Sequence, residues 1–387
     1  GVPGGATEDD AAGAAGAAGA AGAAGGQGRP SPLGTASQFT ILFSVLTIAT
    51  LGFSWHNGAL ERGLKEFLFS VGPLVTAYSL TWLALQKMDP AEWIESLTRH
   101  LAAFSLFMLL FEGAKFALLG ISGGSFSLVE LLVFSKSETE QAVTPSLGFI
   151  FGAVALFMAV RRKWIWMLPP LFLVLLSSKR IVLLGLLGGA GWWLAMTALA
   201  PRFQWVKRGQ HAVIPVVSIL ALVLLLQFAT GGFDTLIEKW TGLNPILLSM
   251  GRRKVFELIL LLEEGSWLPK GIGYTFAALA PFESVVGLTN LHSDILKIYF
   301  EYGLLLAIGV MGAFWLLCRG SIPITMLMVY FVVLFATDNV SIYFEVVLFV
   351  FVIVFALSAD EGNEGHGLQK RSKPAPGMRA TRWRRYR

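Results

Sequence analysis

The sequence predicts an all-α membrane protein, a polytopic bundle of about ten transmembrane helices with one long loop containing amphipathic helices. Of the 387 residues, 55% are hydrophobic and only 14% are charged, whereas about a quarter of the residues of a soluble domain are charged. The apolar residues form runs about as long as a bilayer is thick. The 12 Trp and 29 Phe residues suit a surface that faces lipid and helix ends at the headgroups.

The chain divides into five segments. Residues 1–34 are rich in Gly and Ala, and this composition predicts a disordered extension because it offers little large apolar surface to bury. Seven spans are predicted within 35–228 and three within 293–357, separated by a long loop at 229–292 and followed by a basic tail at 358–387. The apolar runs lie near 38–54, 66–86, 100–120, 145–160, 164–178, 181–200, 212–228, 293–318, 321–336 and 341–357. No charged-then-apolar segment with a small-residue cleavage site opens the chain, so no removed signal peptide is expected.

Basic residues predict the orientation. In a ten-span arrangement, three basic clusters fall on the same side: Arg161 to Lys163, Arg202 to Arg208, and the tail from Lys370. The positive-inside rule then places both termini in the cytoplasm of a multi-pass protein, which in a bacterium means the inner membrane with the long loop in the periplasm. That loop holds five cations, which long loops tolerate, and an anionic ligand at the outer face would explain them.

The stretch from Pro245 to Gly265 has apolar residues at helical spacing and predicts an amphipathic helix along the membrane surface. Arg253 lies one turn before Glu257, which gives it a local ion-pair partner. Arg252 instead shares a face with Phe256 and Ile259 and has no carboxylate there. A guanidinium without a carboxylate partner suits phosphate binding, and snorkelling toward lipid headgroups is an equally good interpretation.

Two pairs of residues outside that helix could also have a role, Lys179 and Arg180 before it and Gly271 and Gly273 after it. Lys179 and Arg180 lie between two apolar runs, where cations are costly and usually face a cavity or a partner, so a functional role is favoured for at least one of them. Gly271 and Gly273 permit a tight turn or a close backbone approach, and a plain loop between helices is the simpler interpretation. Their spacing is not that of a nucleotide-binding loop.

The eighth span begins with a group of polar residues. Asp294, Lys297 and Glu301 fall on one helix face and can neutralise one another, with Glu301 paired to Lys297. His292 lies on another face without a carboxylate and can accept a proton near pH 7. The competing interpretation, favoured by position alone, is an interfacial histidine that caps the helix.

Other polar residues carry less information. Glu112 and Lys115 form a self-satisfied structural pair, and Asp338 and Glu345 have no assigned role. The lone Cys318 makes no internal disulfide, and no Walker motif, HExxH motif or Cys/His ligand spacing is present. The basic residues do not form one compact nucleic-acid-binding surface, and the chain has no large cytoplasmic domain for a nucleotide sugar. Any chemistry is therefore expected to be free of metal and cofactor and to lie on the outer side.

One pattern over about 249–310 resembles the O-antigen ligase and O-antigen polymerase superfamily of bacterial membrane enzymes. The matching residues are Gly251-Arg252, an aromatic at Phe256, Gly271-x-Gly273, His292-Ser293 and Glu301-x-Gly303. The chain departs from the pattern at Phe256, where the family often has Trp, and at Ser293, where Asn is frequent. Elsewhere the likeness is only one of hydropathy, and ten spans is at the short end for the family.

The resemblance implies a metal-independent glycosyltransferase that uses a glycan on a polyprenyl (undecaprenyl) diphosphate and a sugar hydroxyl acceptor. It implies His292 as the base that takes the acceptor's proton and Arg252 as the group that stabilises the leaving diphosphate. The donor diphosphate ligands would be Arg180, Arg252, Lys179 and Arg253. Gly271 and Gly273 would shape the loop, and Glu301 and Tyr299 would support the site.

Three functions remain open. A polymerase passes the glycan to another lipid-linked unit and a ligase passes it to lipid A–core; the polymerase is slightly favoured because no core-oligosaccharide site is recognisable. The expected partners are therefore the lipid-linked donor, a glycan or lipid A–core acceptor and membrane lipids, without nucleic acid. A transporter or flippase of a lipid-linked anionic glycan is the alternative, disfavoured because no internal repeat is present and the charges lie near the outer interface rather than mid-span.

Overall fold

The computed structural model describes residues 33–121, 145–177, 179–249, 251–263, 267–286, 290–319 and 321–371, and all regular structure in these ranges is helical. Six of the described helices are long and apolar enough to cross a membrane. They are α2 (Gly34–His56), α3 (Leu60–Leu85), α4 (Pro90–Ile121), α8 (Arg180–Leu199), α10 (Val213–Ala229) and α16 (Asp294–Cys318). These helices are those of a multi-pass helical membrane bundle, which confirms the predicted class.

Four further apolar helices complete the bundle: α6 (Pro145–Val160), α7 (Trp164–Leu176), α17 (Ile322–Thr337) and α18 (Phe344–Arg371). Each of the ten predicted runs thus falls on a helix, although α6, α7 and α17 are shorter than the six. The predicted tail differs in one respect, because α18 continues without a break from 358 to Arg371. The rest of that tail and residues 1–32 lie outside the described ranges.

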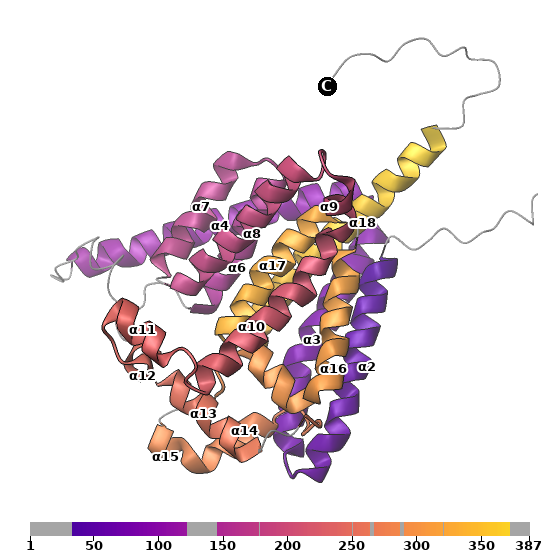
Figure 1. Ribbon diagram of the computed structural model, residues 1–387. Helices are drawn as coiled ribbons and strands as arrows, with labels where there is room; N and C mark the ends of the chain where they lie inside the picture. Colours follow the sequence, from indigo (N-terminus) through magenta and orange to yellow (C-terminus); the bar gives the residue numbers. More distant parts are fainter. Residues whose placement is uncertain are drawn as a thin grey trace, which may run out of the picture.

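Short helices connect the bundle. On the long connection between α10 and α16 lie α11 (Asp234–Thr241), α12 (Pro245–Leu248), α13 (Arg252–Glu263), α14 (Tyr274–Leu279) and α15 (Glu283–Val286). They extend from one end of the bundle, called here the loop end (Figure 1). The remaining short elements are α9 (Gln204–Gly209) and the 3₁₀ turns η3 (Gln210–Ala212), η4 (Ala280–Phe282) and η5 (Val340–Ile342). The single amphipathic helix predicted from Pro245 to Gly265 is therefore two helices, since Gly251 between them has a φ of +82°, which ends a right-handed helix.

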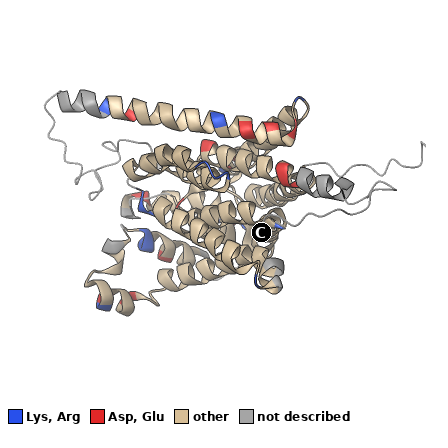
Figure 2. Cartoon of the chain, turned by 90° about the horizontal axis from the view of Figure 1, so that it is seen from above, with Lys and Arg blue, Asp and Glu red and all other residues tan. Residues whose placement is uncertain are grey.

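Aromatic side chains fill the core where α2, α16, α17 and α18 meet. Phe39 stacks on Phe351 with ring centroids 5.3 Å apart, and Phe314 and Phe331 pack edge to face at 6.5 Å. All four rings are buried. Long stretches of the described helices carry no Lys, Arg, Asp or Glu (Figure 2). Apolar packing therefore holds the bundle together.

Tyr330 joins α17 to α6 and α8. Its hydroxyl donates a hydrogen bond to the carbonyl of Phe149 at 2.6 Å, and its ring lies against Gly152 of α6 and Gly185 of α8. A Cβ at Gly152 would clash with the Tyr330 hydroxyl and lie 2.9 Å from Val182. The absence of a side chain at Gly152 is what allows the three helices to approach.

We expect Gly152→Ala to destabilise the bundle by about 1–3 kcal/mol, because the added methyl forces Tyr330 from its place. Gly191→Ala is the matched control. A Cβ there meets nothing within 4 Å, so the better helix propensity of alanine should leave stability unchanged or raise it. Thermal unfolding of the two purified variants in one detergent measures the difference, and equal midpoints would contradict the close-packing role.

Candidate functional site

Asp338 is the centre of a charged cluster at the loop end. It directly follows α17 and its side chain is 8% exposed. His292 Nδ1 lies 3.5 Å from Asp338 Oδ1, and Lys179 Nζ lies 3.8 Å from Asp338 Oδ2. Three segments far apart in the sequence therefore bring a carboxylate, an imidazole and an ammonium together.

The start of α16 holds His292 beside Asp338. Ser293 has an extended backbone with φ −165°, and its hydroxyl accepts a hydrogen bond from the Leu296 amide at 3.3 Å, so Ser293 is the N-cap. The interpretation of His292 as the cap is therefore wrong. The side chain of His292 is 28% exposed while its Nδ1 is fully buried toward Asp338, which leaves other ring atoms accessible.

Asp294 fastens the segment after α17 to the same helix start. Its amide donates to the Asp338 carbonyl at 3.3 Å, and its carboxylate accepts from the Ser341 amide at 2.8 Å and from the Ser341 hydroxyl at 2.5 Å. Both carboxylate oxygens are thus bound to one residue. The positions of His292 and Asp338 relative to each other follow from these bonds.

Arg252 also reaches this segment. It is the first residue of α13, and its Nη1 donates to the carbonyl of Thr337, the residue before Asp338, at 2.9 Å. Phe256 and Ile259, predicted to share its face, are buried. Among the described residues, the guanidinium donates this hydrogen bond to a neutral carbonyl and forms no ion pair with a carboxylate, so it retains donors for an anion.

Arg253 differs from its prediction. Its partner is Asp234 of α11, with Nη1 and Oδ2 2.6 Å apart, rather than Glu257. Only 13% of the Arg253 side chain is exposed. Glu257 lies one turn away on the same helix and is exposed, whereas the fold of the loop brings Asp234 of α11 to the start of α13, where it meets Arg253.

The surroundings keep Asp338 ionised. Burial raises the pKa of the Asp338 carboxyl, but the His292 ring, the Lys179 charge, the Asn339 amide at 2.9 Å and the nearby Arg252 together lower that pKa below its usual value. A carboxylate stabilises an imidazolium ring beside it. The neighbouring Asn339 is 1% exposed, and its side-chain amide has no hydrogen-bond partner among the described residues. Buried polar groups are seldom left without a hydrogen bond, so this amide is available to bind a ligand.

The other candidate residues do not all join this cluster. Arg180 is exposed at the first position of α8 and forms no ion pair within the described part of the chain. Tyr299 packs edge to face on Phe300, with centroids 5.2 Å apart, in the small apolar cluster that α13 also joins. No group of three or more His, Cys, Asp or Glu in the described ranges is arranged to hold a metal ion.

Gly271 and Gly273 lie against the turn between α2 and α3 rather than beside His292. Both have positive φ, +99° and +85°. A Cβ at Gly271 would lie 2.5 Å from the Cα of Ser54, and one at Gly273 would lie 2.7 Å from the amide of Gly63. The close backbone approach that the two glycines permit is present, so the simpler interpretation as a plain loop is incomplete, and the approach anchors the loop to the bundle.

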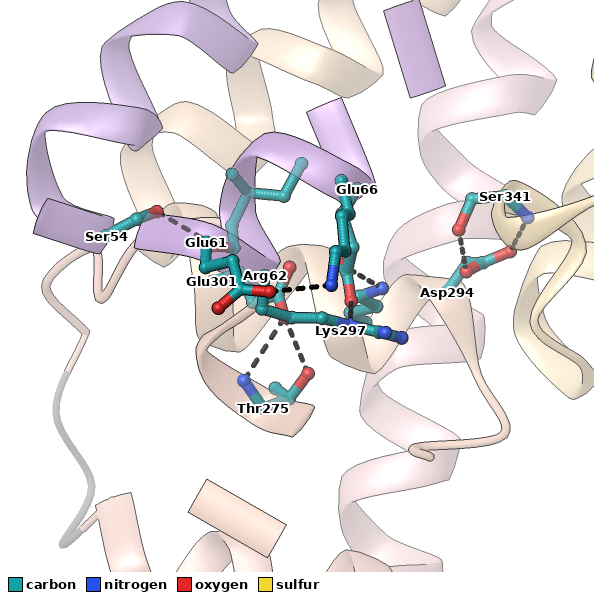
Figure 3. A network of polar contacts seen from close by, with 11 residues as sticks. Ser54, Glu61, Arg62, Glu66, Thr275, Asp294, Lys297, Glu301 and Ser341 are labelled. Carbon is teal, nitrogen blue, oxygen red and sulfur yellow. Dashed lines mark hydrogen bonds and ion pairs between the residues drawn. The ribbon is translucent and has the colours of Figure 1, made fainter. Parts of the chain in front are cut away.

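Glu301 belongs to a second polar network, between α3, α16 and the loop (Figure 3). Its side chain accepts from the Thr275 hydroxyl at 2.6 Å, and its backbone carbonyl accepts from the Gly271 amide at 2.8 Å. Lys297 forms an ion pair with Glu66 of α3, which also binds Arg62 at 3.1 Å. Asp294, Lys297 and Glu301 do line one cavity, as their shared face predicts, but the salt-bridge partner of Lys297 is Glu66 rather than Glu301.

The sequence pointed to His292, Arg252 and Lys179, which the structure gathers around Asp338. The role of Asp338 was missed, because its only signal was a carboxylate at the end of an apolar run, and so was the role of Glu66 in the second turn of α3. The pair predicted between Glu112 and Lys115 is confirmed at 2.9 Å. We compared the chain with protein-family models, with curated proteins and with solved structures, and none of the three comparisons found a match.

Proposed function

We propose that this chain is a membrane glycosyltransferase of the O-antigen ligase and polymerase type. It would move a glycan from a polyprenyl (undecaprenyl) diphosphate to a sugar hydroxyl at the loop end of the bundle, on the periplasmic side of a bacterial inner membrane. The observation that carries the proposal is the convergence of His292, Lys179 and Arg252 on Asp338. That convergence supplies a base and cations for a leaving diphosphate in one place.

The reaction would proceed as a displacement at the anomeric carbon of the donor sugar. The accessible part of the His292 ring accepts the proton of the acceptor hydroxyl, and Asp338, beside Nδ1, stabilises the imidazolium that forms. The acceptor oxygen bonds to the anomeric carbon while the bond from that carbon to the diphosphate oxygen breaks. The diphosphate leaves with the electron pair, and its new charge is offset by Arg252 and Lys179.

Arg180 and Arg253 would have different parts in this reaction. Arg180 is exposed next to Lys179 and is free to contact the outer phosphate of the donor. Arg253 is already paired with Asp234, so its part would be to hold α13 in place. The resemblance over 249–310 supports the same assignment of His292 and Arg252, and the polymerase branch stays slightly favoured over the ligase branch.

A flippase for a lipid-linked anionic glycan is the second candidate, and one observation favours it. Helix α16 is interrupted at Gly303, where φ is +67° and ψ is 170°, and transporters often use broken helices. The freed backbone groups are taken by the loop, however, since the Leu304 amide donates to the Trp267 carbonyl at 3.0 Å. The interruption therefore serves to dock the loop.

The proposal predicts that Arg252→Ala and Arg252→Lys both abolish transfer. The ammonium group of lysine keeps the charge but cannot replace the two parallel hydrogen bonds that a planar guanidinium donates to a phosphate. Purified protein in detergent, given lipid-linked donor and acceptor with a chelator and without nucleotide, should form a glycosidic product. Arg253→Ala is the matched control on the neighbouring residue and should lose less.

Each outcome of this assay bears on one statement. Normal product from Arg252→Ala at equal protein level would contradict the diphosphate role of that residue. A flippase makes no glycosidic bond, so the absence of product from the unchanged protein with several acceptors would favour the second candidate.

A further inference from the structure

A cavity of about 250 Å³ lies where α4 meets the start of α7, at the end of the bundle opposite the loop end. Its walls include Ala102 and Ala103 on α4, whose small side chains leave the space. The same helix contributes Glu95 and Arg99, and the other wall comes from Lys163 and Trp166. Helix α7 begins here and ends near Lys179, so the cavity and the cluster around Asp338 lie at opposite ends of α7.

The charge in this cavity is positive. Lys163 and Glu95 neutralise each other across the two helices, with Nζ and Oε1 3.3 Å apart. Arg99 is exposed and forms no ion pair or hydrogen bond with the described residues. One guanidinium is therefore left in the cavity, with a lysine and an indole N–H nearby to donate further hydrogen bonds.

Next to the charged cavity, both helices present apolar side chains to their surroundings. On α4, Phe107 is 62% exposed and Leu110 is 65% exposed; on α7, Ile165 is 78% exposed and Leu168 is 60% exposed. Phe107, Leu110 and Leu168 follow the cavity residues along their helices toward the middle, and Ile165 lies between Lys163 and Trp166. The charged cavity thus borders a long apolar surface on the outside of the bundle.

We propose that this cavity binds the headgroup of an anionic phospholipid, with the acyl chains lying along α4 and α7. Arg99 would hold the phosphate through its planar fork, and Lys163 and the Trp166 indole would contact the rest of the headgroup. Basic cavities between membrane helices have this use, and Trp commonly lies at headgroup level. The adjoining apolar surface selects a lipid over a soluble phosphate, because a soluble anion gains nothing from it.

The proposal is independent of the glycosyltransferase assignment and is tested on the full chain in detergent by native mass spectrometry. The probes are phosphatidylglycerol and phosphatidylethanolamine at equal concentration. The unchanged protein should retain phosphatidylglycerol preferentially, and Arg99→Ala should weaken that binding about tenfold, as expected for loss of a charge-assisted contact. Arg319→Ala, which removes an exposed arginine at the end of α16 outside the cavity, should bind as the unchanged protein does.

A second variant separates the cavity from its charge. Ala103→Trp fills the space and keeps every charged group, so it should also lose the preference for phosphatidylglycerol. Retention by Arg99→Ala or by Ala103→Trp equal to that of the unchanged protein would overturn the proposal. An equal loss in Arg319→Ala would overturn it as well, because binding would then follow net charge alone.

Discussion

Replacing His292 with alanine is expected to lower glycan transfer at least about a hundredfold, the usual effect of removing a general base. The acceptor hydroxyl would have no group to take its proton, while Arg252 and Lys179 would still hold the diphosphate. Donor binding should therefore persist without product. The measurement is single-turnover product formation by purified variant and unchanged protein, alongside donor binding.

Asp338→Asn is the companion variant. It retains the shape of the side chain beside His292 Nδ1 but removes the charge that stabilises the imidazolium. Transfer should fall less than in His292→Ala, because the imidazole can still take the acceptor's proton while the imidazolium that forms loses its carboxylate partner. For the first variant, unchanged turnover per folded molecule in His292→Ala would contradict the assignment of His292 as the general base, whatever the effect of the change on expression.

Replacing Lys297 with methionine is expected to destabilise the protein by about 3–5 kcal/mol, the range for breaking a buried ion pair on one side. Only 8% of the Lys297 side chain and 6% of the Glu66 side chain are exposed. Methionine fills similar volume, so the loss reports charge rather than space. Glu66 would keep Arg62 as a partner but lose the ammonium on its other oxygen.

Two further variants isolate this effect. Lys65→Met removes a lysine that pairs with Glu61 on the outside of α3, with the two side chains 60% and 87% exposed, and should leave stability nearly unchanged. Lys297→Met combined with Glu66→Gln should recover part of the loss, because the buried carboxylate that lost one of its two cations is then gone. Thermal unfolding in one detergent compares the four proteins, and a loss in Lys65→Met as large as in Lys297→Met would contradict the importance of burial.

Helix positions followed from the sequence because apolar run length depends on local composition alone. Each predicted run lies on a helix, and the pair predicted between Glu112 and Lys115 is a short-range feature of the same kind. The failures at helix ends are also local: Gly251 divides one predicted helix, and α18 runs past the predicted end of its span.

Partnerships between helices could not be predicted. Arg253 binds Asp234 and Lys297 binds Glu66, although each has a carboxylate nearer in the sequence. His292, predicted to lack a carboxylate, faces Asp338, which is 46 residues away in the chain. Helical spacing identifies possible ion-pair partners only within one helix, whereas the partner of a buried charge depends on which helices pack against it.

The class of helical membrane protein follows from the sequence, and so does the choice of His292, Arg252, Lys179 and Arg180 as candidate residues, although local spacing alone left simpler interpretations open for His292 and Arg252. The tertiary structure adds that His292, Arg252 and Lys179 meet at Asp338, that Glu301 and Gly271 dock the loop instead, and that Arg99 borders a cavity. This division arises because the hydrophobicity of a segment depends only on the residues within it. The meeting of charged groups depends on how α8, α13, α16 and α17 pack.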